Sequence, residues 1–293
     1  MRSPLLSLFV FLVACGQQRP ERPKSPITVF AAASLARPLA VLADSFQRRS
    51  TVITRAELGG SLEQARKITE LGRIPDALML VDDEVLEALM PTHLDWYVRF
   101  ATNRIVVAYT TRSKHSDAID AENWWQMLSR RDVSVGRADP AIAPAGRNAL
   151  SVLKRVETYY HKPGLTDRLL SRATLRYVRP NATELAALLE TGEVDYILDY
   201  ESVAKQYGFE FVALPEDLAT AVLYGISVPR QAANFAEGVE FVSFVLSEEG
   251  KRILRDGKVN VLSTPVAIGS VIPPEISQRV RTIAAAITAT AAR

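Results

Sequence analysis

Two serines lie where a short apolar strand gives way to a helix, a place from which a hydroxyl can bind an anion. Ser34 follows the apolar stretch Ile27–Ala31, and Ser61 follows the pair Gly59-Gly60 at the end of a second predicted strand, Val52–Leu58. The first amides of a helix have no partner within it, so they and a Ser hydroxyl can donate together to a negative group. Two simpler roles stay open: Ser34 as a helix cap, and the glycine pair as a tight turn that needs positive φ.

Other kinds of chemistry have less support in the sequence. The three histidines, His93, His115 and His161, fall in predicted turns without the i, i+4 pairing or the nearby Cys of a zinc site. Ser34 and Ser61 lack the G-x-S-x-G elbow and an identifiable His partner. We therefore expect no enzymatic activity and keep a hydrolase as the weaker alternative.

Composition limits the possible partners. The 293 residues include 35 Lys and Arg against 33 Asp and Glu, a balance that gives no sign of a nucleic-acid surface. Any bound anion must therefore be held by local groups. The length suits two lobes of roughly 100 to 150 residues each.

The N-terminus predicts export. An apolar run of residues 5–13 follows Arg2 and is too short to span a bilayer, which takes about 20 residues, but it suits a secretory signal. The sequence from Leu12 to Cys15 resembles the lipobox of bacterial lipoproteins, which implies a signal peptide over 1–14 and acylation of Cys15. A buried structural role is the alternative for this only cysteine. The polar, Pro-rich residues 15–26 predict a tether.

After the tether, strands and helices alternate, which predicts an α/β fold. The two serine turns would lie at one edge of a parallel sheet, where open α/β sheets bind ligands. The apolar run Arg104–Thr110 predicts a buried strand before the chain leaves the first lobe, and Thr220–Ser227 a strand that returns to it. We expect a first lobe of 27–110 and 215–293 and a second of 111–214, each a mixed sheet flanked by helices, joined by two crossing strands that allow hinge closure. The Ala-rich segment Arg279–Ala292 predicts a helix.

An ordered set of motifs runs across nearly the whole mature chain. The motifs are ITVFAAASL, the GGS at 59–61, PDALML, NRIVVAY, ADPAIAPAGRNAL, LLETGEVDYILDYES and FVLSEEGKRIL. This set resembles the substrate-binding proteins of molybdate/tungstate ABC transporters, with the type II periplasmic-binding-protein fold. Two longer segments, WYVRFATNRIVVAYT and ENWWQML, look like the branch that binds tungstate as well as molybdate.

The resemblance implies a cluster of neutral donors around a tetrahedral oxyanion, molybdate or tungstate, and no cofactor. Ser34 and Ser61 match two serines that donate from the first lobe. In the second lobe, Ala145 and Ala182 match positions that donate backbone N–H groups, and Tyr200 matches a tyrosine that donates its hydroxyl. Such donors satisfy a dianion without a buried positive charge.

The match departs from the tungstate branch at two positions where carboxylates can add to the metal. One is Ala143, which has no ligand atom, and the other is Asp199, an acid one methylene shorter than the usual Glu. Our hypothesis is that Asp199 stays off the anion or is protonated, or that the protein takes another ligand.

The resemblance also implies delivery of the anion to an ABC permease driven by an ATPase. The implied protein is a monomer that binds no nucleic acid and is lipid-anchored at Cys15, in the periplasm or at the cell surface. Alternatives are sulfate, phosphate or an organic anion on the same scaffold, or a non-transport scaffold or sensor. Arg147, just after the PAG turn, can face inward to pair with a carboxylate or phosphate, or lie solvated on its helix.

Overall fold

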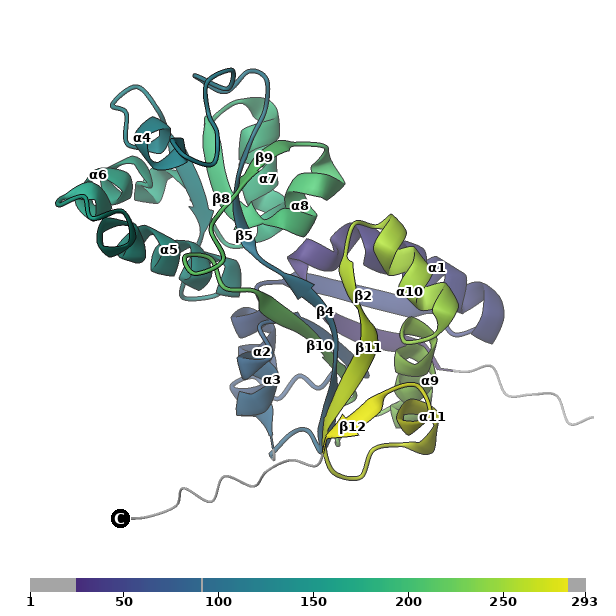
Figure 1. Cartoon of the computed structure of the whole chain (residues 1–293). Coiled ribbons are helices and arrows are strands. Elements are labelled where there is room, and N and C mark those ends of the chain that lie inside the picture. The colour runs from purple at the N-terminus through teal and green to yellow at the C-terminus, as the bar shows by residue number, and fades with distance from the viewer. Residues whose placement is uncertain (1–24, 91, 284–293) are drawn as a thin grey trace, which may run out of the picture.

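Apolar strand segments alternate with amphipathic helices along the chain, and they assemble into two lobes, each around one sheet (Figure 1). The computed structural model describes residues 25–90 and 92–283. The predicted signal peptide, Cys15 and all but the last two residues of the predicted tether lie outside the described residues. Within the described part of the chain, no helix is both long enough and apolar enough to cross a membrane.

The first lobe contains a seven-stranded mixed sheet, in the order β12-β11-β4-β10-β3-β1-β2. β1 is parallel to β2 and β3, whereas β10 runs antiparallel to β3 and β4. All five residues of β3, ALMLV, are buried, as expected for a strand covered on both faces. The strands are β1 (Ile27–Ala32), β2 (Thr54–Gly59), β3 (Ala77–Val81), β4 (Trp96–Asn103), β10 (Val222–Ser227), β11 (Asn260–Gly269) and β12 (Arg281–Ile283).

Helices cover both faces of this sheet (Figure 1). α2 and α3 enclose a small apolar core around Phe30, Leu80 and Tyr97, and the other helices enclose the main core of the lobe. The helical segments are the 3-10 turn η1 (Ala33–Leu35), α1 (Ala36–Ser50), α2 (Ser61–Thr69), α3 (Glu84–Leu89), α9 (Phe235–Val245), α10 (Glu248–Asp256) and α11 (Pro274–Ser277).

The second lobe contains a five-stranded mixed sheet, in the order β7-β6-β8-β5-β9. α5 packs on one face of the sheet with α6 beside it, and α7 and α8 pack on the other face (Figure 1). The elements are β5 (Ile105–Tyr109), β6 (Val135–Ala138), β7 (Val178–Arg179), β8 (Tyr196–Tyr200), β9 (Glu210–Ala213), α4 (Trp124–Leu128), α5 (Pro144–Tyr160), α6 (Leu165–Arg172), the 3-10 turn η2 (Leu175–Tyr177), α7 (Ala182–Thr191) and α8 (Glu201–Tyr207).

The expected fold class is confirmed, but the strand pairing corrects one predicted boundary between the lobes. β5 pairs antiparallel with β8 and β9, so the chain crosses into the second lobe at Arg104 and not after Thr110. The run Arg104–Thr110 is indeed buried strand, but apolarity alone does not say which sheet a strand joins. The return crossing lies between β9 and β10, in residues 214–221.

The predicted C-terminal helix is wrong where it can be checked. Arg281–Ile283 form β12, which runs parallel to β11. The pairing available at the free edge of β11 outweighs helix propensity in these residues. Residues 279 and 280 form a turn and a bend, and residues 284–292 lie outside the described residues.

Candidate functional site

A small cavity lies between the two lobes, where several strands end and helices begin. It leaves about 20 Å³ for the centre of a water-sized sphere, where a single water needs roughly 10–15 Å³. This closed arrangement therefore suits a compact ligand and has no room for an extended one. The lining residues are Ala32, Ala33, Ser34, Gly59, Gly60, Ser61, Val81, Ala143, Pro144, Ala145, Asn181, Ala182 and Tyr200.

The two lobes are in contact around this cavity. The Glu63 amide donates to the carbonyl of Ile142 at 3.3 Å, and the Gln206 side chain donates to the carbonyl of Ser34 at 2.9 Å. Arg147, whose orientation the sequence left open, pairs with Asp82 of the first lobe at 3.0 Å. These contacts between opposite lobes describe a closed form.

Ser34 does not cap a helix. It is the middle residue of η1, is 4% exposed, and makes no cap hydrogen bond. Its hydroxyl lies 2.9 Å from the hydroxyl of Tyr224 on β10. The capping interpretation of Ser34 is therefore wrong, because its hydroxyl bonds Tyr224 on β10, which β3 separates from β1 in the same sheet.

Ser61 is the first residue of α2 and is held by the backbone. Its hydroxyl oxygen accepts a hydrogen bond from the Val81 amide at 3.1 Å, and the residue is fully buried. The preceding Gly60 has φ of −69°, so the turn does not need a positive φ. Glycine is needed there for space, because a Cβ on Gly60 would lie 2.1 Å from the carbonyl oxygen of Ile142 in the other lobe.

The second lobe presents two helix starts to the cavity. Pro144 is the first residue of α5 and Ala145 the second, while Ala182 is the first residue of α7. Amides in a first helical turn have no partner within the helix and carry the positive end of its dipole. Asn181 caps α7, and its side-chain oxygen accepts from the Glu184 amide at 3.0 Å.

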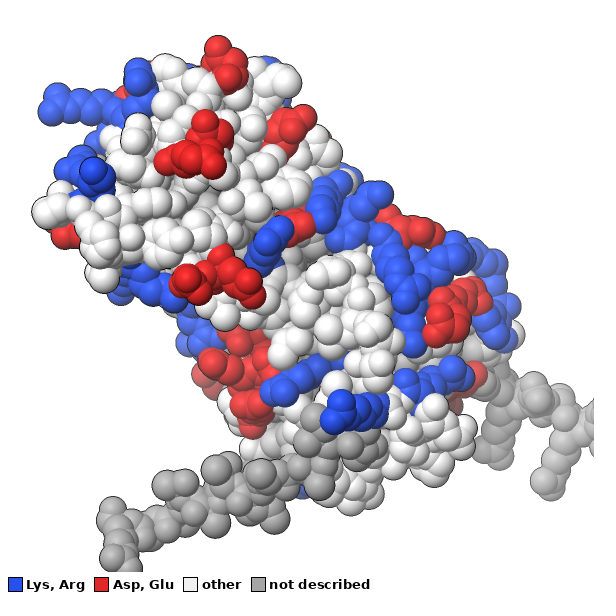
Figure 2. Space-filling view, in the orientation of Figure 1, with Lys and Arg blue, Asp and Glu red and all other residues white. Residues whose placement is uncertain are grey.

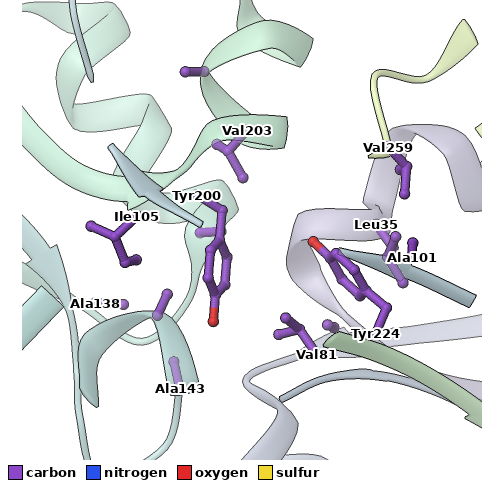
Figure 3. Close-up of a cluster of buried hydrophobic side chains, with 14 of the residues drawn as sticks. Leu35, Val81, Ala101, Ile105, Ala138, Ala143, Tyr200, Val203, Tyr224 and Val259 are labelled. Carbon is purple, nitrogen blue, oxygen red and sulfur yellow. The ribbon is translucent and has the colours of Figure 1, made fainter. Parts of the chain in front are cut away.

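Tyr200 adds a hydroxyl donor from the second lobe. It is the last residue of β8, 1% exposed, and accepts a hydrogen bond from the Asn148 side chain at 3.2 Å. Burial raises the pKa of Tyr200 well above its usual value of 10, so the hydroxyl keeps its proton. Figure 3 shows Tyr200 on the side of the second lobe and Tyr224 on the side of the first.

Asp199 is fully buried but is not among the residues that line the cavity. One carboxylate oxygen accepts from the Tyr200 amide at 2.7 Å, and the other has no hydrogen-bond partner among the described residues. Burial raises the pKa of Asp199 from 3.8 to about 7. Ala143 does line the cavity, with a methyl group.

The cavity is rich in hydrogen-bond donors and has no charged side chain among its described lining residues. Hydroxyls and helix-start amides favour a ligand that only accepts hydrogen bonds, which is the property of an anion. In the described part of the chain, no group of three or more His, Cys, Asp or Glu could hold a metal ion. Over the face in Figure 2, basic and acidic side chains are interspersed.

The structure brings Ser34, Ser61, Ala145, Ala182 and Tyr200 to one cavity, as the sequence predicted, and leaves Asp199 behind it. Sequence reasoning missed the partners of these groups. Tyr224 lies within the apolar run TAVLYGIS, where a tyrosine is indistinguishable from a core residue.

Comparisons with known proteins agree with this fold. Residues 27–257 match the family described as bacterial extracellular solute-binding protein. The molybdate/tungstate-binding protein WtpA of Pyrococcus abyssi is 30% identical over 92% of this chain and 95% of its own. A solute-binding protein of Petrotoga mobilis is 34% identical over 89% of this chain and 91% of its own.

Solved structures show the same architecture. The periplasmic molybdate-binding protein of Azotobacter vinelandii superimposes with a TM-score of 0.68 at 15% identity, over 81% of this chain and 100% of that one. The sulfate-binding protein SubI of Mycobacterium tuberculosis gives 0.65 at 14% identity, over 82% and 88%. At these identities the likeness concerns the fold alone. Together with the match over residues 27–257, it places the chain in the family of bacterial extracellular solute-binding proteins.

Proposed function

We propose that this chain captures a tetrahedral oxyanion, molybdate or tungstate, between its lobes. The observation that carries the proposal is the closed cavity to which both lobes bring hydroxyls or helix-start amides and no charged side chain. The similarity to the molybdate/tungstate-binding protein WtpA supports the choice of anion.

In this proposal each lobe donates some of the hydrogen bonds to the anion. Ser34 and Ser61 donate hydroxyl protons from the first lobe, and Tyr200 donates one from the second. The amides of Ala145 and Ala182 add backbone donors. A ligand shifts an open–closed equilibrium only through differential affinity, so an anion that touches both lobes stabilises the closed form.

The donor chemistry also separates the candidate anions. A phosphate that keeps a proton needs an acceptor, and the cavity offers few. Apart from the hydroxyls, the described lining side chains have the oxygen of Asn181, which already accepts from the Glu184 amide. Sulfate has the same acceptor chemistry as molybdate, but its bonds to oxygen are shorter. The small cavity favours a compact anion over an extended organic one.

Asp199 takes no part in coordination in this proposal. A neutral carboxyl behind Tyr200 adds no repulsion to a dianion, and its raised pKa supports the neutral form up to about pH 7. With Ala143 in place of the other acid, the metal keeps its four oxygens and gains no protein carboxylate.

The last step of the proposed function is delivery of the anion to a transporter. The closed form docks on an ABC permease coupled to an ATPase, and acylation of Cys15 anchors the monomeric protein outside the cytoplasmic membrane. The cavity serves binding and not turnover, since no histidine is among its described lining residues to act as a base for either serine.

A thermal-shift panel of molybdate, tungstate, sulfate, phosphate and chromate tests the proposal. A ligand at 100 times its dissociation constant adds about 2.7 kcal/mol of stability. We expect clear stabilisation by molybdate and tungstate. A response to sulfate or phosphate alone would overturn the choice of anion, and hydrolysis of a generic ester or phosphate would favour the enzyme.

A further inference from the structure

A buried hydrogen-bond network links Ser34 to the hinge. The hydroxyl of Tyr224 lies 2.9 Å from that of Ser34, and the side-chain nitrogen of Asn103 donates to Tyr224 at 2.7 Å. Asn103 is the last residue of β4, directly before the crossing at Arg104. Ser202 of α8 joins the network from the second lobe, 2.8 Å from the same Asn103 nitrogen. All four side chains of the network are buried.

The orientation of the Asn103 amide is fixed by its neighbours. Its oxygen accepts from the backbone amides of Arg104 at 3.0 Å and Ser202 at 3.3 Å. Backbone N–H groups can only donate, so the side-chain NH₂ must face the other way, toward Tyr224 and Ser202. An NH₂ group is itself an obligate donor, and Tyr224 therefore receives a proton from Asn103.

The direction of the hydrogen bond between Tyr224 and Ser34 follows from this orientation. With its oxygen accepting from Asn103, Tyr224 has one proton to donate, and Ser34 at 2.9 Å is closer than Ser202 at 3.4 Å. Burial raises the pKa of Tyr224, so this proton is retained. Once Ser34 accepts from Tyr224, its own proton is free for the cavity that Ser34 lines.

We propose that Tyr224, held by Asn103, is a positioning residue that directs the hydroxyl proton of Ser34 into the oxyanion cavity. The inference rests on the proposed function. Tyr224 does not line the cavity and acts on the anion through Ser34. Without it, Ser34 can rotate and offer a lone pair to the anion, which costs affinity.

A double-mutant cycle on the purified full chain tests this inference, with tungstate affinity measured by calorimetry. We expect Ser34→Ala to weaken binding roughly tenfold to a hundredfold, in line with one charge-assisted hydrogen bond. Tyr224→Phe should weaken it by about threefold to tenfold. The double variant should bind like Ser34→Ala alone, because Tyr224 acts through that hydroxyl.

A control variant separates positioning from general damage. Tyr97→Phe removes a tyrosine hydroxyl on β4 that bonds Glu87 and takes no part in the network. It should bind tungstate like the wild type. A purely structural role for Tyr224 would change stability without the non-additive loss of affinity.

The outcomes distinguish this inference from the proposed function. Unchanged affinity in Tyr224→Phe, or costs that add in the double variant, would overturn the inference while wild-type binding upholds the function. A wild-type protein that binds none of the tetrahedral oxyanions would overturn both.

Discussion

Ser34 and Ser61 follow neighbouring parallel strands and line the same cavity, yet they are held in different ways. The oxygen of Ser61 accepts from the backbone amide of Val81, whereas the hydroxyl of Ser34 meets the side chain of Tyr224. Of the residues that can replace Val81, proline alone lacks the backbone N–H, whereas Tyr224→Phe removes the side-chain donor directly. In the proposed function, one half of the first lobe's contacts with the anion therefore depends on the main chain and the other half on a network at the hinge.

The largest expected effect comes from the turn before Ser61. Gly60→Ala places a methyl group where the Ile142 carbonyl oxygen of the other lobe lies 2.1 Å away, so the lobes cannot close as observed. We expect at least a hundredfold loss of tungstate affinity, because both lobes then no longer reach the anion together. Calorimetry measures the loss, and tight tungstate binding by the variant would contradict the closed form. The free energy of unfolding without anion is the control. It should stay near the wild-type value, because an ordinary residue adopts the φ of −69° found at Gly60.

Ser61→Ala and Ser34→Ala test directly whether the two serines are held in different ways. Each removes one charge-assisted hydrogen bond and should weaken anion binding by roughly 1.5 to 3 kcal/mol. Their costs in stability should differ. Ser61→Ala leaves the buried Val81 amide without its partner, at about 1–3 kcal/mol. After Ser34→Ala, Tyr224 still accepts from Asn103 and can turn its proton to the Ser202 hydroxyl. Chemical denaturation without anion compares the two variants, and equal stability losses would contradict this account.

Because of Asp199, the free energy of unfolding should depend on pH. Its carboxyl has a pKa of about 7 in the fold against 3.8 when unfolded. As pH rises from 4 to 7, the unfolded chain releases this proton and the folded chain keeps it, so the free energy of unfolding falls. The full difference is on the order of 4 kcal/mol. Asp199→Asn should remove this fall, and its gain over the wild type should be greatest above pH 7, as measured by denaturation across pH.

Anion binding should follow the same titration. Above pH 7 the ionised Asp199 repels a dianion, so wild-type affinity should fall by several-fold, and Asp199→Asn should bind equally at pH 6 and pH 8. Calorimetry at the two pH values measures this. Loss of binding in Asp199→Asn would instead assign the carboxylate to the metal.

The smallest effect is expected at the ion pair across the lobes. Arg147 and Asp82 meet at 3.0 Å with the arginine side chain 39% exposed, so solvent weakens the pair. Arg147→Gln should weaken tungstate binding by at most about fivefold, and less at high salt. Arg252→Gln, which removes an exposed pair with Asp256 within α10, is the matched control and should bind like the wild type. A much larger loss in Arg147→Gln would mean that this residue contacts the anion.

The sequence predicted the alternation of strands and helices and the residues around the cavity. Strand ends and helix starts carry local signals, such as Ser61 after two glycines and Pro144 at the start of α5. Which sheet a buried strand joins has no such signal, and so the apolar run of β5 does not reveal that it belongs to the second lobe. Likewise, no local pattern joins Ser34 to Tyr224, which is 190 residues away.

Asp199 could have been separated from Tyr200 by a simple rule. Successive side chains of a strand point to opposite faces, and both residues belong to β8. The carboxylate therefore lies behind the cavity that Tyr200 lines. The resemblance to a family matches the two residues to ligand positions but does not include this geometry.

A crystal structure with bound tungstate tests the central claim most directly, because the anomalous signal of tungsten locates the metal. We predict a single tetrahedral anion between Ser34, Ser61 and Tyr200, with Asp199 off the metal. Tungsten at another place, or a carboxylate oxygen of Asp199 coordinated to it, would contradict the account.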